Sequence, residues 1–206
     1  MKHTTFSLLL SFVFCPLLLF SARFRSVEIQ MEQTGPLTMS AQVIVYIAAS
    51  ESMIDGFRET LLLSWGDDST SEVSIVNGTD EDGDGILDGE LIEPGFRKFV
   101  YAGEHVYPVA GRFVVSVTNP SRHAGILNIN FPNSISTQMY TETEIEVFAD
   151  NTSNHTPVLL EPGRVDLAAT DEVFLHLPNG YDQDDDEVTY KLETAERQWT
   201  QQFSKQ

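Results

Sequence analysis

The amino-acid sequence predicts an all-β protein built as a β-sandwich, followed by the start of a second β-sandwich. From Ser26 onward, apolar residues fall in short runs with a period of two, and these runs are rich in β-branched and aromatic residues. Glycine, proline, asparagine and aspartate separate the runs. Alternation of this kind buries one face of each strand, and the separating residues favour turns. Several such strands in succession are typical of a sandwich.

The first 22 residues are predicted to be a secretory signal peptide rather than part of either sandwich. Lys2 precedes an apolar run over Phe6–Ala22, and the charged residues Arg23–Arg25 end it. This run is short and contains a proline, so we do not expect a permanent transmembrane span. We expect cleavage near Ala22 and a secreted or outer cell-surface location. Cys15 then leaves with the signal peptide, so the mature chain has no disulfide and no thiol nucleophile.

The first sandwich is expected over residues 23–150. Four alternating runs predict its clearest strands, which are Ala41–Ala48, Glu59–Trp65, Gly111–Asn119 and Thr141–Ala149. Between the first two, Ser50–Phe57 is the one stretch whose pattern fits a short helical turn.

A polar stretch without alternation, residues 151–156, predicts a linker, and residues 157–206 are expected to form a second, shorter β-unit. Strand-like runs continue to Val188–Thr194, which gives roughly 40 residues of β pattern, about half of a sandwich domain of around 100 residues. We therefore expect this second sandwich to be truncated. The tail Ala195–Gln206 has no alternation and is expected to be helical or disordered.

The formal net charge is −19, with 31 acidic residues among 206. Repulsion therefore disfavours nucleic acid and anionic membranes as partners. Two interpretations remain open: the charge serves solubility, or clustered carboxylates bind divalent cations such as calcium.

The stretch Thr79–Glu90 has the spacing of a calcium loop. Asp80, Asp82, Asp84 and Asp88 occupy positions one, three, five and nine, a glycine stands at position six, and Ile86 at position seven can offer its carbonyl oxygen. Alternating carboxylates can converge on an ion that takes six to eight oxygens at about 2.3–2.6 Å. Position twelve is leucine rather than glutamate, which argues against a full EF-hand. A solvated hairpin turn is the alternative, because turns also require aspartate and glycine.

A second candidate calcium site is the acidic turn that contains Asp182, Asp184 and Asp186, with Asn154 and Glu161 as assisting ligands. Adjacent carboxylates also protect an edge strand from pairing with other chains, and this remains the alternative.

Other polar residues suggest no chemistry. Asp67 and Asp68 are expected to form a turn. The histidines are scattered singly, without the spacing that zinc requires. No nucleophile elbow, phosphate-binding loop or dinucleotide-binding motif is present, so we expect no enzymatic activity.

Two stretches resemble the PKD (polycystic kidney disease) domain pattern. They are LLLSWGDDST, residues 61–70, and EHVYPVAGRFVVSVTN, residues 104–119. The resemblance implies an immunoglobulin-like sandwich in which Trp65, Tyr107 and Phe113 pack in the core and His105 is structural.

Three further stretches resemble the N-terminal region of large secreted Bacteroidetes surface proteins of the gliding-motility-associated C-terminal-domain type. They are residues 26–50, residues 119–129 and residues 154–192, the last with NHTPVLLEP and FLHLPNGYDQDDDEVTYKL. The resemblance implies a PKD-like module over residues 26–149 and the start of a cadherin-like or immunoglobulin-like module over residues 157–193.

By this resemblance the protein is a structural or adhesive module without catalytic activity, which has surface proteins or polysaccharides as partners and is expected to be an elongated monomer. The alternative is a carbohydrate-binding accessory module, because PKD-like domains also occur beside polysaccharide-degrading domains. The chain departs from the family in the second acidic turn, where YDQDDD, residues 181–186, replaces the family pattern YDPDGD and its glycine.

Overall fold

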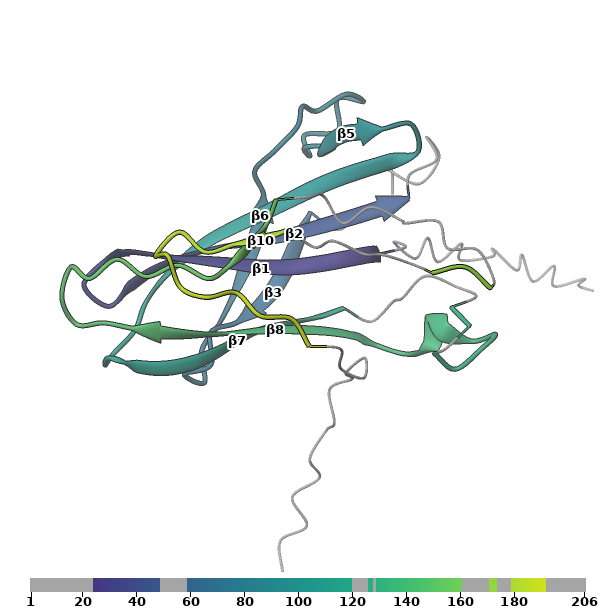
Figure 1. The fold of residues 1–206 in the computed structure, drawn as a ribbon. Helices are drawn as coiled ribbons and strands as arrows, with labels where there is room; N and C mark the ends of the chain where they lie inside the picture. The colour runs from purple at the N-terminus through teal and green to yellow at the C-terminus, as the bar shows by residue number, and fades with distance from the viewer. Residues whose placement is uncertain are drawn as a thin grey trace, which may run out of the picture.

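In the computed structural model of the chain, residues 24–48, 59–119, 126–127, 129–160, 171–173 and 179–191 are described. These residues are almost all β-structure (Figure 1). The strands are β1 Phe24–Gly35, β2 Thr38–Ala48, β3 Thr60–Ser64, β4 Thr70–Ile75, β5 Glu90–Glu93, β6 Phe96–Val106, β7 Gly111–Asn119, β8 Met139–Val147, β9 Val158–Leu159 and β10 Gly180–Tyr181, with the short 3-10 helix η2 at Ser134–Ser136.

Eight antiparallel strands form one strongly curved sheet in the order β1-β2-β6-β4-β3-β7-β8, with β5 paired to the edge of β6. The sheet folds over itself, so that β1, β2 and β6 lie on one side and β7 and β8 on the other (Figure 1). At one end the two sides meet, where the amide N–H of Leu37 donates to the carbonyl oxygen of Phe148 at 2.9 Å. The predicted all-β, immunoglobulin-like architecture is confirmed.

The core lies between the two sides and is filled by alternate residues of each strand. In β2, Val43, Val45 and Ile47 are buried in this core, and in β7 the pair Val115 and Val117 faces them. Full burial of a side chain of this size contributes about 1.5–3 kcal/mol, so the alternating runs provide most of the driving force for folding. Each of the four strands predicted most clearly is present, with ends within three residues of those expected.

The aromatic residues of the PKD-like pattern pack together, with Trp65 and Tyr107 in the core and Phe113 against its edge. The side chain of Trp65 is 0% exposed, and its indole N–H donates to the hydroxyl of Ser71 at 2.9 Å. The ring of His105 stacks on the Trp65 ring with centroids 4.9 Å apart, and Tyr107 donates its hydroxyl to the carbonyl oxygen of Trp65 at 3.0 Å. Phe113 packs against Tyr107 with centroids 4.2 Å apart. The predicted core positions of Trp65 and Tyr107 are confirmed, whereas Phe113 is only partly buried.

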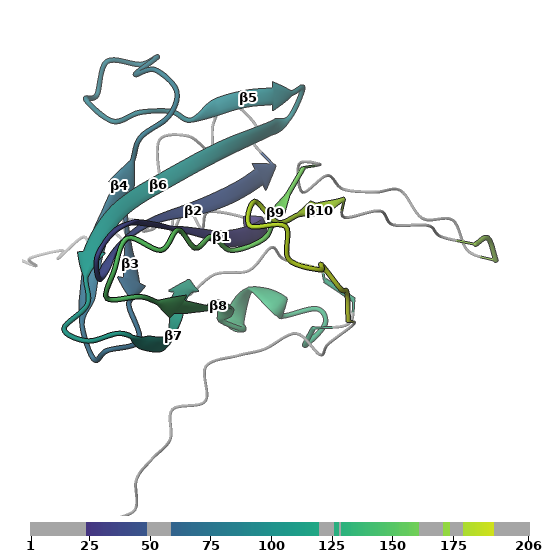
Figure 2. The same ribbon diagram turned by 60° about the vertical axis from the view of Figure 1, so that its left-hand side comes forward.

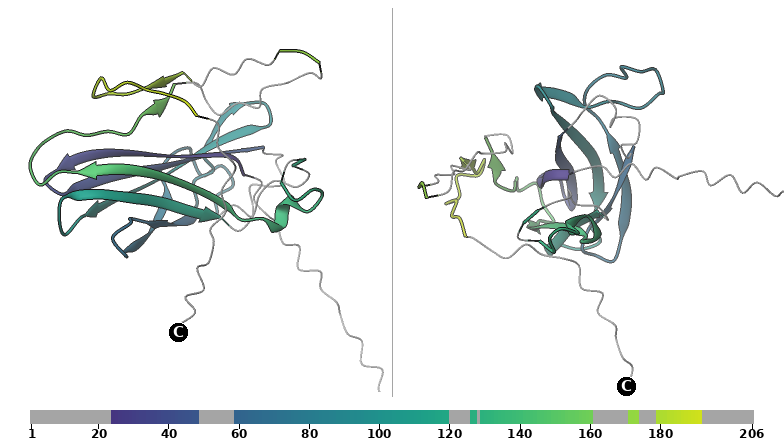
Figure 3. Two further views of the ribbon diagram at one scale, coloured as in Figure 1. Left: turned by 60° about the horizontal axis from the view of Figure 1, so that its bottom comes forward. Right: turned by 90° about the vertical axis from the view of Figure 1, so that its right-hand side faces the viewer.

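The chain after β8 lies along β1 (Figures 2 and 3). Met31 accepts a backbone hydrogen bond from Thr156 at 2.9 Å and donates its own N–H to the Thr156 hydroxyl at 2.8 Å. The amide N–H of Gln33 donates to the carbonyl oxygen of Asn154 at 2.8 Å. Residues 154–156, part of the predicted linker, are thus hydrogen-bonded to the edge of the first sheet. We call residues 154–160 the strap.

Within the strap, β9 pairs with β10 in a two-stranded antiparallel sheet. The predicted strand Val188–Thr194 is not a strand over residues 188–191, where the structure describes it. The Tyr190 hydroxyl instead accepts a hydrogen bond from the amide N–H of Gly180 at 2.5 Å, a side-chain contact rather than a strand ladder. In the part of the chain that is described, no helix is long and apolar enough to cross a membrane. The predicted signal peptide, helical turn and C-terminal tail lie outside the described residues.

Candidate metal site

The acidic loop joins β4 to β5 and is closed at its base by two glycines. Gly78 and Gly89 pair in a parallel bridge, with φ values of 87° and 69°. A Cβ on Gly78 would lie 2.1 Å from the carbonyl oxygen of Gly89, so no other residue fits there without backbone movement. Asn77 fixes the same base to β6, because its amide donates to Lys98 O at 2.9 Å and accepts from Val100 N at 2.7 Å. Figure 2 shows the loop beside β5.

Inside the loop, the aspartates accept hydrogen bonds from the loop's own backbone. The two oxygens of Asp80 accept from Gly83 N at 2.7 Å and from Gly85 N at 3.0 Å. Asp88 accepts from the N–H of Glu81 at 2.6 Å, which joins the two ends of the loop. These bonds hold the carboxylates in fixed positions and balance part of their charge.

Three of the predicted ligands converge. Asp80, Asp82 and Asp88 each offer a carboxylate oxygen, and these oxygens lie within 4.8 Å of one another. Two oxygens that each lie about 2.4 Å from one ion can be no further apart than about 4.8 Å, so the group has the geometry to hold a metal ion. Asp88 is buried, at 6% exposure, while the other two are exposed.

Of the other two predicted ligands of this loop, Asp84 lies outside the group of carboxylates, and ligation by the Ile86 carbonyl oxygen stays a prediction. Asp84 accepts a hydrogen bond from the N–H of Ile86 at 2.8 Å, and its carboxylate does not join the other three. The Ile86 side chain packs against the edge of the hydrophobic core.

Arg97, which the sequence analysis did not single out, anchors the loop from β6. Its side chain is buried, and its guanidinium donates to the carbonyl oxygen of Asp88 at 2.9 Å and to the carboxylate of Glu81 at 2.8 Å. The hydrogen bond from Arg97 lowers the pKa of Glu81. The positive charge is therefore committed to Glu81 and a backbone oxygen, not to the three aspartates. Arg97 alternates with Phe99 and Tyr101 along β6, and this apolar phase is the sequence signal that could have suggested a buried role.

Electrostatic repulsion between the carboxylates of the loop shifts the pKa of Asp82. A hydrogen bond from the Asp84 N–H lowers the pKa of Asp82, but desolvation and the negative charges of Asp84, Asp88 and Asp80 together raise it above its ordinary value. A group whose ionised form is disfavoured by neighbouring carboxylates is one that a cation would stabilise.

The second predicted site is not assembled in the same way. One oxygen of Asp182 accepts from Asp184 N at 2.8 Å and from Asp186 N at 3.4 Å. Asp184 accepts from the backbone N–H of His155 at 2.7 Å, and its other oxygen lies 3.0 Å from the imidazole Nδ1. Among the described residues, these three aspartates do not form a group close enough to hold a metal ion.

His155 of the strap holds the Asp184 carboxylate, and the second calcium site stays a prediction. Desolvation raises the pKa of Asp184, but the hydrogen bonds and the charge of His155 outweigh it and lower the pKa overall. Of the two assisting ligands, Asn154 donates its side-chain amide to Glu146 O at 2.6 Å, and Glu161 lies outside the described residues.

Asp67 has a structural role, as predicted for the Trp-Gly-Asp turn. One of its oxygens accepts from the Ser69 N–H at 3.1 Å, and the other lies 2.7 Å from Nε2 of His105. Desolvation raises the pKa of Asp67, but the hydrogen bonds from Ser69 and His105 outweigh it and lower the pKa overall. Burial and the charge of Asp67 raise the pKa of Tyr107.

Comparisons of the chain with protein-family models, with curated proteins and with solved structures found no match in any of the three. The resemblance to surface proteins therefore remains a prediction from sequence motifs.

Proposed function

We propose that this protein is a non-catalytic structural module of a secreted or cell-surface protein, stiffened by calcium bound in the loop between β4 and β5. The observation that carries the proposal is the convergence of Asp80, Asp82 and Asp88 within 4.8 Å. The motif order that resembles gliding-motility-associated surface proteins supports a spacer or adhesive role for the module.

Calcium is the ion that best fits this chemistry. The converging ligands are all carboxylate oxygens, which hard cations prefer, and the exposed side of Asp80 and Asp82 can admit water to complete a coordination number of six to eight. Magnesium demands a stricter octahedron and gives up its water reluctantly. Calcium is also abundant outside cells, where a protein with a signal peptide would function.

The bound ion would act on the fold through the loop's two anchors. Asp88 is buried and connects through its carbonyl oxygen to Arg97 of β6, while Asp80 and Asp82 lie at the exposed end of the loop. An ion shared by these three residues would join the exposed end to the core. It would also neutralise the repulsion that raises the pKa of Asp82. The expected consequence is a stiffer module rather than a catalytic centre.

The hydrogen bonds of the strap are a second observation that supports a spacer role. Its hydrogen bonds to Met31 and Gln33 hold the chain that leaves the first sheet against β1. A joint with this many fixed contacts transmits force better than a flexible linker does.

Calcium titration of the protein, followed by calorimetry and by thermal unfolding, tests this proposal. One ion bound at a hundred times its dissociation constant should stabilise the fold by about 2.7 kcal/mol. Asp82→Asn should weaken calcium binding at least tenfold. Asp184→Asn is the matched control and should leave calcium affinity unchanged, because its carboxylate already serves His155.

A protein that shows no binding heat and no change in melting temperature at millimolar calcium would disprove the calcium-stiffened module. Equal losses of affinity in Asp82→Asn and Asp184→Asn would place the ion elsewhere.

A further inference from the structure

A trough runs along the outer face of the sheet formed by β1, β2, β6 and β5, opposite to the hydrophobic core. It consists of two adjoining hollows, of about 120 Å³ and about 480 Å³, both lined by Gln30, Gln42 and Val158. The smaller hollow continues toward Ser40 and His155, and the larger one continues toward Glu90 and Lys98. We call this continuous surface the trough.

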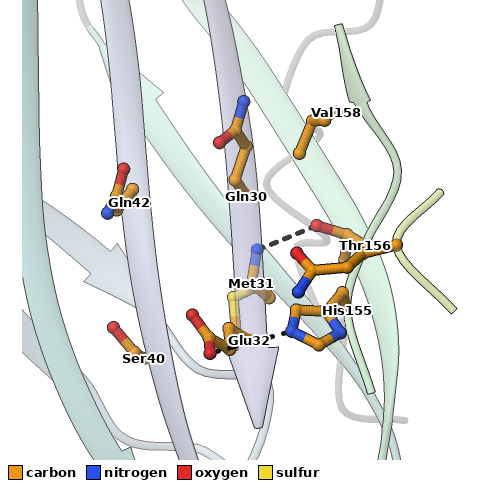
Figure 4. Close-up of a pocket in the computed structure, with 9 residues that line it drawn as sticks. Gln30, Met31, Glu32, Ser40, Gln42, His155, Thr156 and Val158 are labelled. Atoms are coloured by element: carbon orange, nitrogen blue, oxygen red, sulfur yellow. Dashed lines mark hydrogen bonds and ion pairs between the residues drawn. The ribbon is translucent and has the colours of Figure 1, made fainter. Parts of the chain in front are cut away.

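One side of the trough is built by the strap. Figure 4 shows Thr156 and Val158 of the strap facing Gln30 of β1, with the hydrogen bond from the Met31 N–H to the Thr156 hydroxyl drawn between them. His155 lies 3.7 Å from the Glu32 carboxylate and is held from its other side by Asp184. The wall is therefore positioned by specific hydrogen bonds to the sheet.

The lining is rich in side chains that form hydrogen bonds. Gln30 and Gln42 are directly opposite each other in the β1–β2 register, and Glu28 is two residues from Gln30 on the same face. Glu90 and Lys98 are opposite each other in the β5–β6 register. Amides and carboxylates on adjacent strands thus form a flat array of donors and acceptors about 5 Å apart across the sheet.

Ile44 and Tyr46 contribute buried, largely apolar side chains to the lining of the larger hollow. Ile44 and Tyr46 are 4% and 5% exposed, although alternation places them on the opposite face from Val43, Val45 and Ile47 of the core. Glu28, which also lines this hollow, is partly buried. Burial raises the pKa of the Glu28 carboxyl, against the lowering effects of the Lys98 charge and a hydrogen bond with Gln30. A desolvated surface with aligned polar groups is the usual character of a small-ligand site.

The position of the trough selects between ligand classes. β2 lies in the middle of the sheet and pairs with β1 on one side and β6 on the other, so its backbone groups are already used. An extended peptide has no free strand edge there to pair with, and peptide recognition by strand addition is excluded at this position. Recognition must come from side chains, and glutamine and glutamate side chains pair well with hydroxyl groups.

The charge of the residues that line the trough restricts the class of ligand further. Glu28, Glu32 and Glu90 line the trough, and the chain carries a net charge of −19. Anionic ligands would be repelled, whereas uncharged hydroxyl groups would not. We propose that the trough binds a neutral, polyhydroxylated ligand of the oligosaccharide class, with Gln30 and Gln42 as its central hydrogen-bonding groups.

The test is calorimetric titration of the purified protein with cellohexaose, xylohexaose, mannohexaose and maltohexaose, with hexagalacturonate as the anionic counterpart. At least one neutral hexaose should bind, and hexagalacturonate should bind at least tenfold more weakly. Gln30→Ala and Gln42→Ala should each reduce the affinity for that hexaose at least tenfold. Glu72→Ala, at an exposed position on β4 that does not line the trough, is the matched control and should leave the affinity unchanged.

Absence of binding by all four neutral sugars would overturn the proposal, as would binding that survives both glutamine substitutions or that favours hexagalacturonate. Circular dichroism and thermal unfolding of each variant confirm that a lost affinity is not a lost fold. The proposal does not depend on the calcium loop. If the protein binds sugar but not calcium, the proposed calcium stiffening is disproved and the trough proposal stands. If it binds calcium but not sugar, the trough proposal is disproved and the calcium site stands.

Discussion

The loop over Thr79–Glu90 and the turn over residues 181–186 both alternate aspartates, yet their carboxylates have different partners. In the loop, three carboxylates approach one another, and the nearby cation, Arg97, is bound to Glu81 and a carbonyl oxygen instead. In the turn, Asp184 is bound to His155 and Asp182 to the turn's own backbone. The pKa of Asp82 is accordingly raised and that of Asp184 lowered. A pattern of aspartates therefore predicts a metal site only where no other side chain has taken the carboxylates.

The largest effect is expected from Arg97→Met, which removes the anchor of the loop while keeping the apolar volume. The buried carbonyl oxygen of Asp88 loses its charged donor and Glu81 loses its partner, so we expect a loss of about 2 kcal/mol in the free energy of unfolding. Urea denaturation in chelator measures it. Arg112→Met, at a side chain that is 70% exposed, is the control and should change the stability by less than about 0.5 kcal/mol. Equal effects would show that Arg97 does not anchor the loop.

A smaller effect is expected from Asp184→Ala, which separates the turn from the strap. Loss of two hydrogen bonds to a partly exposed carboxylate should reduce stability by about 1 kcal/mol at pH 7. Because the pKa of Asp184 is lowered from 3.8 in the folded protein, this contribution is present above about pH 3.8 and disappears as the pH falls through the lower folded pKa.

Urea denaturation across the range from pH 2 to pH 7 tests this dependence. Asp186→Ala, at an exposed aspartate in the same turn, is the control and should match the unsubstituted protein. A difference between Asp184→Ala and the unsubstituted protein that stayed constant below pH 3.8 would contradict the proposed origin of the stability.

Asp185→Gly tests whether the turn is strained at the position where the family pattern has glycine. Asp185 has a φ of 64°, a left-handed conformation that costs most residues about 1–2 kcal/mol. Glycine removes that strain but gains freedom in the unfolded chain, so a net stabilisation of about 0.5 kcal/mol is expected by thermal unfolding. Asp171→Gly, at another exposed aspartate with a φ of 64°, tests whether the gain is general. A destabilised Asp185→Gly protein would mean that the Asp185 side chain has a role of its own.

The smallest expected effect is a difference in the sign of the stability change. It distinguishes the acidic loop over Thr79–Glu90 from the acidic turn over residues 181–186. In chelator at pH 7, Asp82→Asn should slightly raise the urea midpoint, because the raised pKa of Asp82 means that its ionised form destabilises the fold as the pH rises above 3.8. Asp184→Asn should lower the midpoint under the same conditions. Addition of calcium should reverse the order for Asp82→Asn only. A midpoint that falls for both variants in chelator would show that the Asp82 charge is not repelled in the loop.

Local residue patterns were sufficient to predict four strands of the main sheet and much of the core. The alternation in β2 and β7 matches the buried residues, and the Trp-Gly-Asp turn correctly marked Trp65 as core. Such features depend on residues close together in the chain, because a strand's two faces repeat every two residues. The same local spacing placed Asp80, Asp82 and Asp88 in one loop.

The tertiary structure decided which of these residues have partners, because the partners come from distant segments. Asp88 reaches Arg97 across a hairpin, and Asp184 meets His155 from 29 residues away. Residues 154–156 of the strap, predicted as part of a linker, became part of the sheet edge because Met31 and Gln33 of β1 offered backbone groups to them. The sequence by itself determined where carboxylates are concentrated, and only the packing of strands determined which of them remain available to an ion. Periodicity is a local property, whereas charge compensation depends on whichever side chain the fold brings within about 3 Å.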